Sequence, residues 1–188
     1  MSFISYLKPN NNLVLNPNDV DIGFAQAMMK HHDEAIILST LAIHSADPQI
    51  EKLTHVIVIA QSHERGLMQG WLTAWGKPVV PSGSTMDWVD LPSKQISVED
   101  LNYISRCKAS EGGLMPGSPT MNDFEQLSSR TGPAKDRLFL ELMIRHHEAA
   151  VEMAEFAGRH AQSELIKSLT NQIKREQLKE LLMMKGML

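Results

Sequence analysis

The sequence contains the same short run of potential metal ligands twice. Each run places a methionine three and four residues before two adjacent histidines: Met28, His31 and His32 in the first, and Met143, His146 and His147 in the second. Residues three and four apart share one face of a helix, so each run can present thioether and imidazole groups together. Thioether sulfur is a soft ligand that suits Cu(I), and imidazole suits copper, zinc, iron and nickel. The pattern therefore predicts Cu(I), or the similar ion Ag(I), as the bound metal.

These runs belong to a longer internal repeat. Residues 24–76 and residues 139–186 share six identities at an offset of 115 and seven more at an offset of 116. The matched polar and sulfur-bearing residues of the later part are Gln61, Glu64 and Met68 in the first copy, and Gln177, Glu180 and Met184 in the second. We interpret the repeat as a duplication. The copies differ at one potential ligand, because Leu38 stands where the second copy has Met153.

Long helices are needed to position these residues, and the sequence predicts four. Apolar residues recur with helical periodicity from about residue 18 to 45, from Pro48 to about Trp75, from about residue 133 to 160, and from Ser163 to about Gly186. Short connections make each successive pair an antiparallel hairpin. The predicted fold is therefore all-α: four long helices as two duplicated antiparallel hairpins.

We expect residues 1–15 to form a tail and residues 16–188 to form a single duplicated helical bundle. Its parts are repeat 1 (about 18–76), a connector (77–132) and repeat 2 (about 133–187). The connector, rich in proline, should hold short helices near 98–107 and 119–129, and a turn in which Met115 looks exposed.

The hairpin register predicts which residues meet. The first histidine of each run lies on the apolar stripe of its helix, so His31 should face Gln61 and Glu64, and His146 should face Gln177 and Glu180. Each hairpin would then hold its own metal site. The candidate ligands are Met28, His31, His32 and Met68 in the first copy, and Met143, His146, His147, Met153 and Met184 in the second; Gln61, Glu64, Gln177 and Glu180 would orient the histidines. Because Met153 belongs to the second copy, we expect the tighter site around His146 and His147.

Other interpretations of the same residues stay open. The histidines can form a structural network with the Glu and Gln residues and bind no metal, since buried polar groups need partners. The inward methionines can be core filler. A di-iron site would require Glu-x-x-His motifs, which the sequence lacks, and a structural zinc site would normally use more Cys or His. His160 stands near a helix C-terminus, where the helix dipole favours a cationic histidine, and Cys107 is expected to be a buried small hydrophobe.

The segment from Phe139 to Ala154, with Met143, His146 and His147 within it, resembles the signature of the domain-of-unknown-function 305 family. The turn at residues 115–117 and the lead-in at residues 136–139 fit the pattern of the same family, and the resemblance covers most of residues 20–187. It implies a ferritin-like helical bundle with an internal repeat, and for several members copper binding and copper tolerance. Many members are exported, whereas the first residues here do not follow the signal-peptide pattern.

Composition narrows the functional classes. The net charge is -4, with both signs mixed along the chain, so we expect no nucleic-acid partner. The longest apolar runs fall short of the roughly 20 residues of a membrane span, so we expect no membrane partner. We expect a metal ion as the partner, a cytoplasmic location (or a periplasmic one if an export segment has been removed), and no enzymatic activity; homo-oligomerisation stays open.

Overall fold

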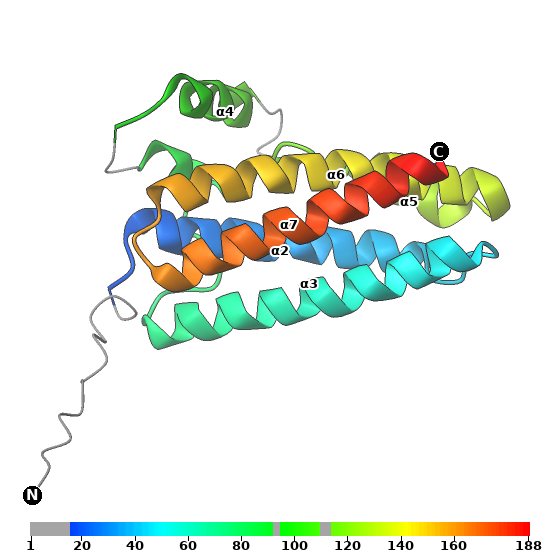
Figure 1. Cartoon of the computed structure of the whole chain (residues 1–188), viewed down its shortest axis with the longest axis horizontal. Coiled ribbons are helices and arrows are strands. Elements are labelled where there is room, and N and C mark those ends of the chain that lie inside the picture. Colours follow the sequence, from blue (N-terminus) through cyan, green and yellow to red (C-terminus); the bar gives the residue numbers. More distant parts are fainter. Residues whose placement is uncertain (1–15, 92–94, 110–113) are drawn as a thin grey trace, which may run out of the picture.

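The computed structural model describes residues 16–91, 95–109 and 114–188, and the regular structure in these ranges is entirely helical (Figure 1). The four long helices are α2 (Asp19–Ala42), α3 (Pro48–Ala74), α6 (Gly132–His160) and α7 (Glu164–Met187). Between α3 and α6 lie the short elements η1 (Asp87–Asp90), α4 (Val98–Ala109) and α5 (Met121–Ser129). The prediction of an all-α protein is confirmed. The predicted tail, residues 1–15, lies outside the described residues.

Local capping explains where the helices begin. At α2, Asn18 Oδ1 accepts the Asp21 N–H at 2.9 Å while the Asp21 carboxylate accepts the Asn18 N–H at 2.7 Å, which is a capping box. At α3, Asp47 accepts the Gln49 N–H at 2.8 Å and Pro48 occupies the first turn. The predicted start of α5 at residue 119 is two residues early, because Thr120 is its N-cap.

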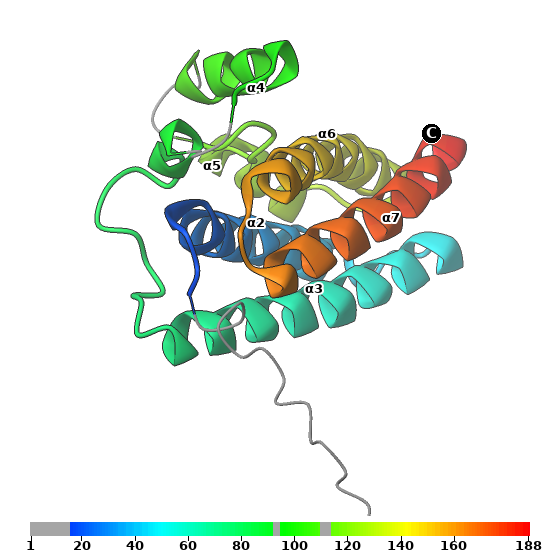
Figure 2. The ribbon, with the colours of Figure 1, turned by 60° about the vertical axis from the view of Figure 1, so that its left-hand side comes forward.

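The long helices pack as two hairpins, α2 with α3 and α6 with α7, and α2 also lies side by side with α6 (Figures 1 and 2). The helices α2 and α6 run antiparallel, since the start of α2 meets the end of α6. Buried apolar residues form two clusters. One contains Phe24, Met28 and Met153, and the other contains Leu38 and Met143. Among the described helices, none combines the length and apolar character that crossing a membrane requires.

A close approach in the connector depends on a glycine. Trp88 of η1 packs edge-on against Phe24 and Phe156, with ring centroids 6.0 Å and 5.5 Å apart. Its Cβ lies so near Gly23 that a Cβ at residue 23 would be only 2.0 Å away. A glycine on α2 is therefore required for η1 to cover this part of the core, which the sequence pattern did not predict.

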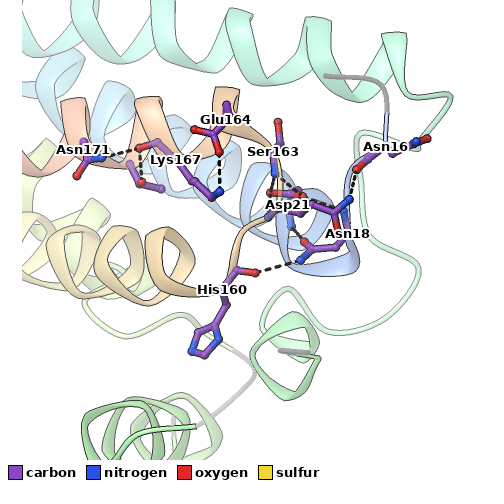
Figure 3. Close-up of polar contacts among 10 residues, drawn as sticks. Asn16, Asn18, Asp21, His160, Ser163, Glu164, Lys167 and Asn171 are labelled. Atoms are coloured by element: carbon purple, nitrogen blue, oxygen red, sulfur yellow. Dashed lines mark hydrogen bonds and ion pairs between the residues drawn. The ribbon is translucent and has the colours of Figure 1, made fainter. Parts of the chain in front are cut away.

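A buried carboxylate ties the two hairpins together at one end of the molecule. Figure 3 shows Asp21, on the first turn of α2, beside the loop that joins α6 to α7. Its carboxylate accepts the backbone N–H groups of Gln162 and Ser163, each at 3.1 Å, and Asn18 Nδ2 donates to the His160 carbonyl at 3.0 Å. Burial raises the pKa of Asp21, while these N–H donors oppose the rise. This contact fixes α2 relative to α6, and so fixes the residues further along both helices.

Candidate metal centre

The centre of the molecule is a pair of stacked histidines, one from each hairpin. His31 of α2 and His146 of α6 have ring centroids 3.5 Å apart and ring planes 30° apart, and both side chains are 0% exposed. The sequence predicts that each faces the partner helix of its own hairpin, and the structure adds that each ring stacks on the ring from the other hairpin. Helix periodicity shows that a residue points to the core but not toward which helix, and here the core stripes of α2 and α6 face each other.

The second histidine of each run meets the carboxylate of its own hairpin. His32 Nε2 lies 2.8 Å from Glu64 Oε2, and His147 Nε2 lies 2.8 Å from Glu180 Oε2. Adjacent helical residues point about 100° apart, so one histidine faces the other hairpin while its neighbour faces the partner helix. The structure thus brings the predicted carboxylates to histidines, but to His32 and His147.

Many polar atoms around this centre are buried without a hydrogen-bond partner among the described residues. They are both ring nitrogens of His31 and His146, Nδ1 of His32 and His147, and both amide atoms of Gln61 and Gln177. An unsatisfied buried group costs about 1–3 kcal/mol, so such a concentration is typical of a ligand site rather than of a structural network. The donor set fits a bound metal ion, because each unpartnered imidazole nitrogen is a potential ligand.

Electrostatics favour the ligand form of these rings. Burial, reinforced by the neighbouring histidines, holds the pKa of His31 and His146 well below the usual histidine value. Both rings are therefore neutral near pH 7, and a neutral imidazole carries the lone pair that a metal ion needs.

The predicted methionine ligands are all buried but divide differently from the sequence repeats. Met28, Met68 and Met153 belong to one apolar cluster, while Met143 and Met184 belong to the other, together with Leu38. Because α2 and α6 run antiparallel, residues after His146 lie beside residues before His31. Met153 therefore joins the methionines of the first hairpin. The sequence analysis predicts instead that Met153 adds a ligand to the second hairpin.

Sequence reasoning missed Glu34, which lies beside the histidine pair, and predicted the wrong exposure for Met115. Glu34 Oε2 lies 3.5 Å from His146 Nε2 and accepts the Ser118 hydroxyl at 2.7 Å. Burial raises the pKa of Glu34 to about 7, although the Ser118 hydrogen bond opposes the rise. Met115, expected to be exposed, is 2% exposed and belongs to the same cluster as Met28. Comparison of the two repeats did not point to Glu34, because the equivalent residue of the second copy is Ala149.

A separate polar cluster anchors the connector to α6. Asp100 of α4 accepts from Arg159 at 2.7 Å and lies 3.0 Å from His160 Nε2. Burial alone would raise the pKa of Asp100, but hydrogen bonds from Ser97, Arg159 and His160 hold it at about 2. His160 thus has a buried carboxylate partner that its place near a helix end did not reveal. Cys107 is buried, as expected, and burial raises its thiol pKa to about 11.

The geometry limits which metal ions fit. Within the described ranges, no group of three or more His, Cys, Asp or Glu side chains is placed to hold a metal ion. A structural zinc ion normally takes four such ligands. Imidazole nitrogens supplemented by thioethers instead suit a soft monovalent ion, which accepts few ligands.

Several solved structures are similar to this chain in fold, and some of them hold a bound metal ion. The crystal structure of a putative secreted protein from Streptomyces coelicolor is 27% identical, covers 90% of this chain and 91% of its own, and has a TM-score of 0.76. A fragment from Deinococcus radiodurans is 25% identical, with coverage of 89% and 94% and a TM-score of 0.67. CopM in its Cu(I)-bound form is 24% identical, with coverage of 88% and 93% and a TM-score of 0.62, a similarity that shows the fold alone. A search of curated proteins finds no match.

These comparisons correct one prediction and establish the family. The expected cytoplasmic location is contradicted, because the similar Streptomyces coelicolor protein is a putative secreted protein. The sequence model of the family described as "Domain of unknown function (DUF305)" matches residues 21–188. The S. coelicolor and D. radiodurans structures carry the same family description. The chain therefore belongs to the DUF305 family.

Proposed function

We propose that this protein binds a soft monovalent metal ion, Cu(I) or Ag(I), and serves in copper handling or copper tolerance. The observation that carries the proposal is the stacked pair of His31 and His146, whose ring nitrogens are buried without a geometric hydrogen bond among the described residues, with the Glu34 carboxylate 3.5 Å from His146 Nε2. A bound ion would satisfy one nitrogen of each ring, because a neutral imidazole has a single nitrogen with a free lone pair while the other carries a proton.

The residues that would hold the ion are His31 and His146, whose rings stack on each other, with His32, His147 and buried methionines on the same two helices. His31 and His146 can each offer either ring nitrogen, whereas His32 and His147 have only Nδ1 free because Glu64 and Glu180 occupy their Nε2 atoms. Carboxylates in this position orient the rings and make them more basic. CopM, which is similar in fold, has been solved with Cu(I), Cu(II) and Ag bound, which supports the choice of ion.

The wider setting follows from the same site. We infer that the bundle is ferritin-like and arose by duplication, since each hairpin supplies one ring of the stacked pair. The protein would act by binding rather than by catalysis, and outside the cytoplasm, in line with the putative secreted protein that it resembles.

A second function is favoured by the histidine–glutamate contacts. The bonds from His32 to Glu64 and from His147 to Glu180 would also suit a purely structural network that joins the helices of each hairpin. That alternative predicts no metal binding, and it leaves the nitrogens of His31 and His146 without a role.

Competition titration separates the two functions. Metal-free protein is titrated with Ag(I), and with Cu(I) under reducing conditions, against a chelator of known affinity. A double variant, His31→Leu with His146→Leu, should bind at least 100-fold more weakly, whereas a control with the exposed His55→Ala and His63→Ala should bind like the wild type. Bound ion at 100 times its dissociation constant should stabilise the wild type by about 2.7 kcal/mol. Equal affinity of the double variant and the wild type would exclude this site.

A further inference from the structure

The turn formed by residues 115–118 lies directly on the part of α6 that carries His146. Gly117 has a φ of +77° and approaches α6 so closely that a Cβ there would lie 2.5 Å from Ala149 Cβ. The same Cβ would lie 2.8 Å from the Arg145 carbonyl oxygen. Only glycine allows both this φ and this approach, so the turn is in direct contact with the backbone of α6.

Helix α2 holds the other side of the turn. The Ser118 hydroxyl donates to Glu34 Oε2 at 2.7 Å, and the same oxygen lies 3.5 Å from His146 Nε2. Met115, at the beginning of the turn, is buried in the apolar cluster that contains Met28. One hydrogen bond between side chains and one buried thioether thus connect the turn to α2 and the core.

The turn contacts equivalent positions of the two repeats. Glu34 follows His31 by three residues, and Ala149 follows His146 by three residues. Residues three apart are neighbours on a helix surface, so both contact points lie about one helical turn from the stacked rings. Since the turn contacts both helices within about one helical turn of the stacked rings, it lies beside the histidine pair.

We propose that the turn formed by residues 115–118 is a removable cover over the His31–His146 pair, and that the hydrogen bond from Ser118 to Glu34 is its latch. The inference rests on the metal-binding function proposed above. Because the rings are 0% exposed, an ion can reach them only when part of the protein moves. The long helices have 24 to 29 residues each and bury apolar faces along their length, whereas the turn is held by a few contacts. Opening the turn breaks these few contacts, whereas separating the long helices would expose their apolar faces, so the turn opens more easily than the helix pair separates.

If the turn is a cover, weakening the hydrogen bond from Ser118 to Glu34 should change the rates at which the ion binds and leaves, and not its dissociation constant. The proposal has the turn close over the pair both with and without an ion, so weakening the latch favours opening equally in both states. Association and dissociation of the ion then accelerate by the same factor, and the dissociation constant stays unchanged. A residue that only stabilised the fold would not accelerate both rates together.

The first experiment measures access to the histidines in the metal-free, full-length protein. Diethyl pyrocarbonate modifies accessible imidazoles, and mass spectrometry of peptides gives the rate at each site relative to the exposed His55 in the same sample. Ser118→Ala should raise the modification rate of His31 and His146 about tenfold, because a hydrogen bond to a carboxylate is lost. Glu34→Gln should stay within about twofold of the wild type, because its amide oxygen still accepts from Ser118.

A matched control comes from the same connector. Ser97 accepts the Asp100 N–H at the start of α4, remote from the histidine pair, so Ser97→Ala should leave the modification rates unchanged. A folded Ser118→Ala variant that is modified no faster than Ser97→Ala overturns the proposal. If Ser118→Ala loses helical circular dichroism, Glu34→Ala, which removes the acceptor instead, decides by the same criterion.

The second experiment follows Ag(I) by stopped-flow mixing. Both the association and the dissociation rate should rise about tenfold in Ser118→Ala, with the dissociation constant within twofold of the wild type. A change in affinity without a change in rates contradicts the cover. If the wild type binds no Ag(I), the proposed function fails, while the modification rates still decide whether the turn covers the pair.

Discussion

The adjacent histidines on α2 should respond to leucine substitution with opposite signs. In the metal-free protein, His31→Leu combined with His146→Leu removes four buried ring nitrogens that make no geometric hydrogen bond among the described residues, although His146 Nε2 lies 3.5 Å from Glu34 Oε2. By contrast, His32→Leu removes a ring bonded to the buried Glu64 carboxylate at 2.8 Å. Leucine and histidine have similar volumes, so cavities contribute little to either result.

The magnitudes follow from these contacts. With about 1 kcal/mol regained for each of four unsatisfied nitrogens and about 1 kcal/mol lost with the stacking of His31 on His146, the double variant should be roughly 3 kcal/mol more stable. For a chain of this size that corresponds to a rise in melting temperature of roughly 6–12 °C. His32→Leu should be less stable by about 3–5 kcal/mol, because it leaves a buried carboxylate without its main partner.

Urea unfolding followed by circular dichroism, at pH 7.5 with a chelator present, measures both effects. The double variant should also show no rise in melting temperature on addition of Ag(I), whereas the wild type should show one. A double variant less stable than the wild type would refute the reasoning, because it would mean that His31 and His146 make stabilising interactions without metal. His63→Leu, at an exposed position of α3, is the control and should change stability by less than about 0.5 kcal/mol.

Three further predictions concern the residues around this centre. The folded-state pKa of Glu34, about 7, lies above its ordinary value of 4.5, so the carboxyl stabilises the fold most below pH 4.5 and loses this contribution as the pH rises through 7. The difference in unfolding free energy between the wild type and Glu34→Gln should therefore fall between pH 4.5 and 7 and be constant above; a constant difference throughout would contradict the assignment. Gly23→Ala should destabilise the protein by about 1–3 kcal/mol in urea unfolding and shift tryptophan fluorescence, because its Cβ would overlap Trp88. An unchanged free energy of unfolding would show that η1 can move away from residue 23 without cost. Asp21→Ala should leave the N–H groups of Gln162 and Ser163 without an acceptor, and should speed their hydrogen exchange at least tenfold, which mass spectrometry can measure. Equal exchange would mean that the loop between α6 and α7 does not depend on this carboxylate.

The long helices could be predicted because their determinants are local. Periodicity locates their apolar faces, and caps such as Asn18 and Asp47 locate their beginnings within a few residues. The short element η1 was not predicted, because its position depends on how Trp88 fits against Gly23, a contact distant in sequence.

The site was only half predictable for the same reason. The repeat and the hairpin register brought Glu64 and Glu180 to histidines, since helices joined by a short loop have a nearly fixed register. The stacking of His31 on His146 depends instead on how one hairpin packs against the other, which no local pattern encodes. Glu34 was missed because the repeat, which drew attention to the other residues, has an alanine at the equivalent position.

The stacked pair also makes each hairpin incomplete. His31 and His146 come from segments more than a hundred residues apart in the sequence, so a chain of half this length carries a single ring. Such a chain could form the pair only by associating with a second copy, with the two rings meeting on an axis of true twofold symmetry. A covalent link between the halves removes that dependence on concentration. It also frees the two sides to diverge, as they have done at Glu34 and Ala149.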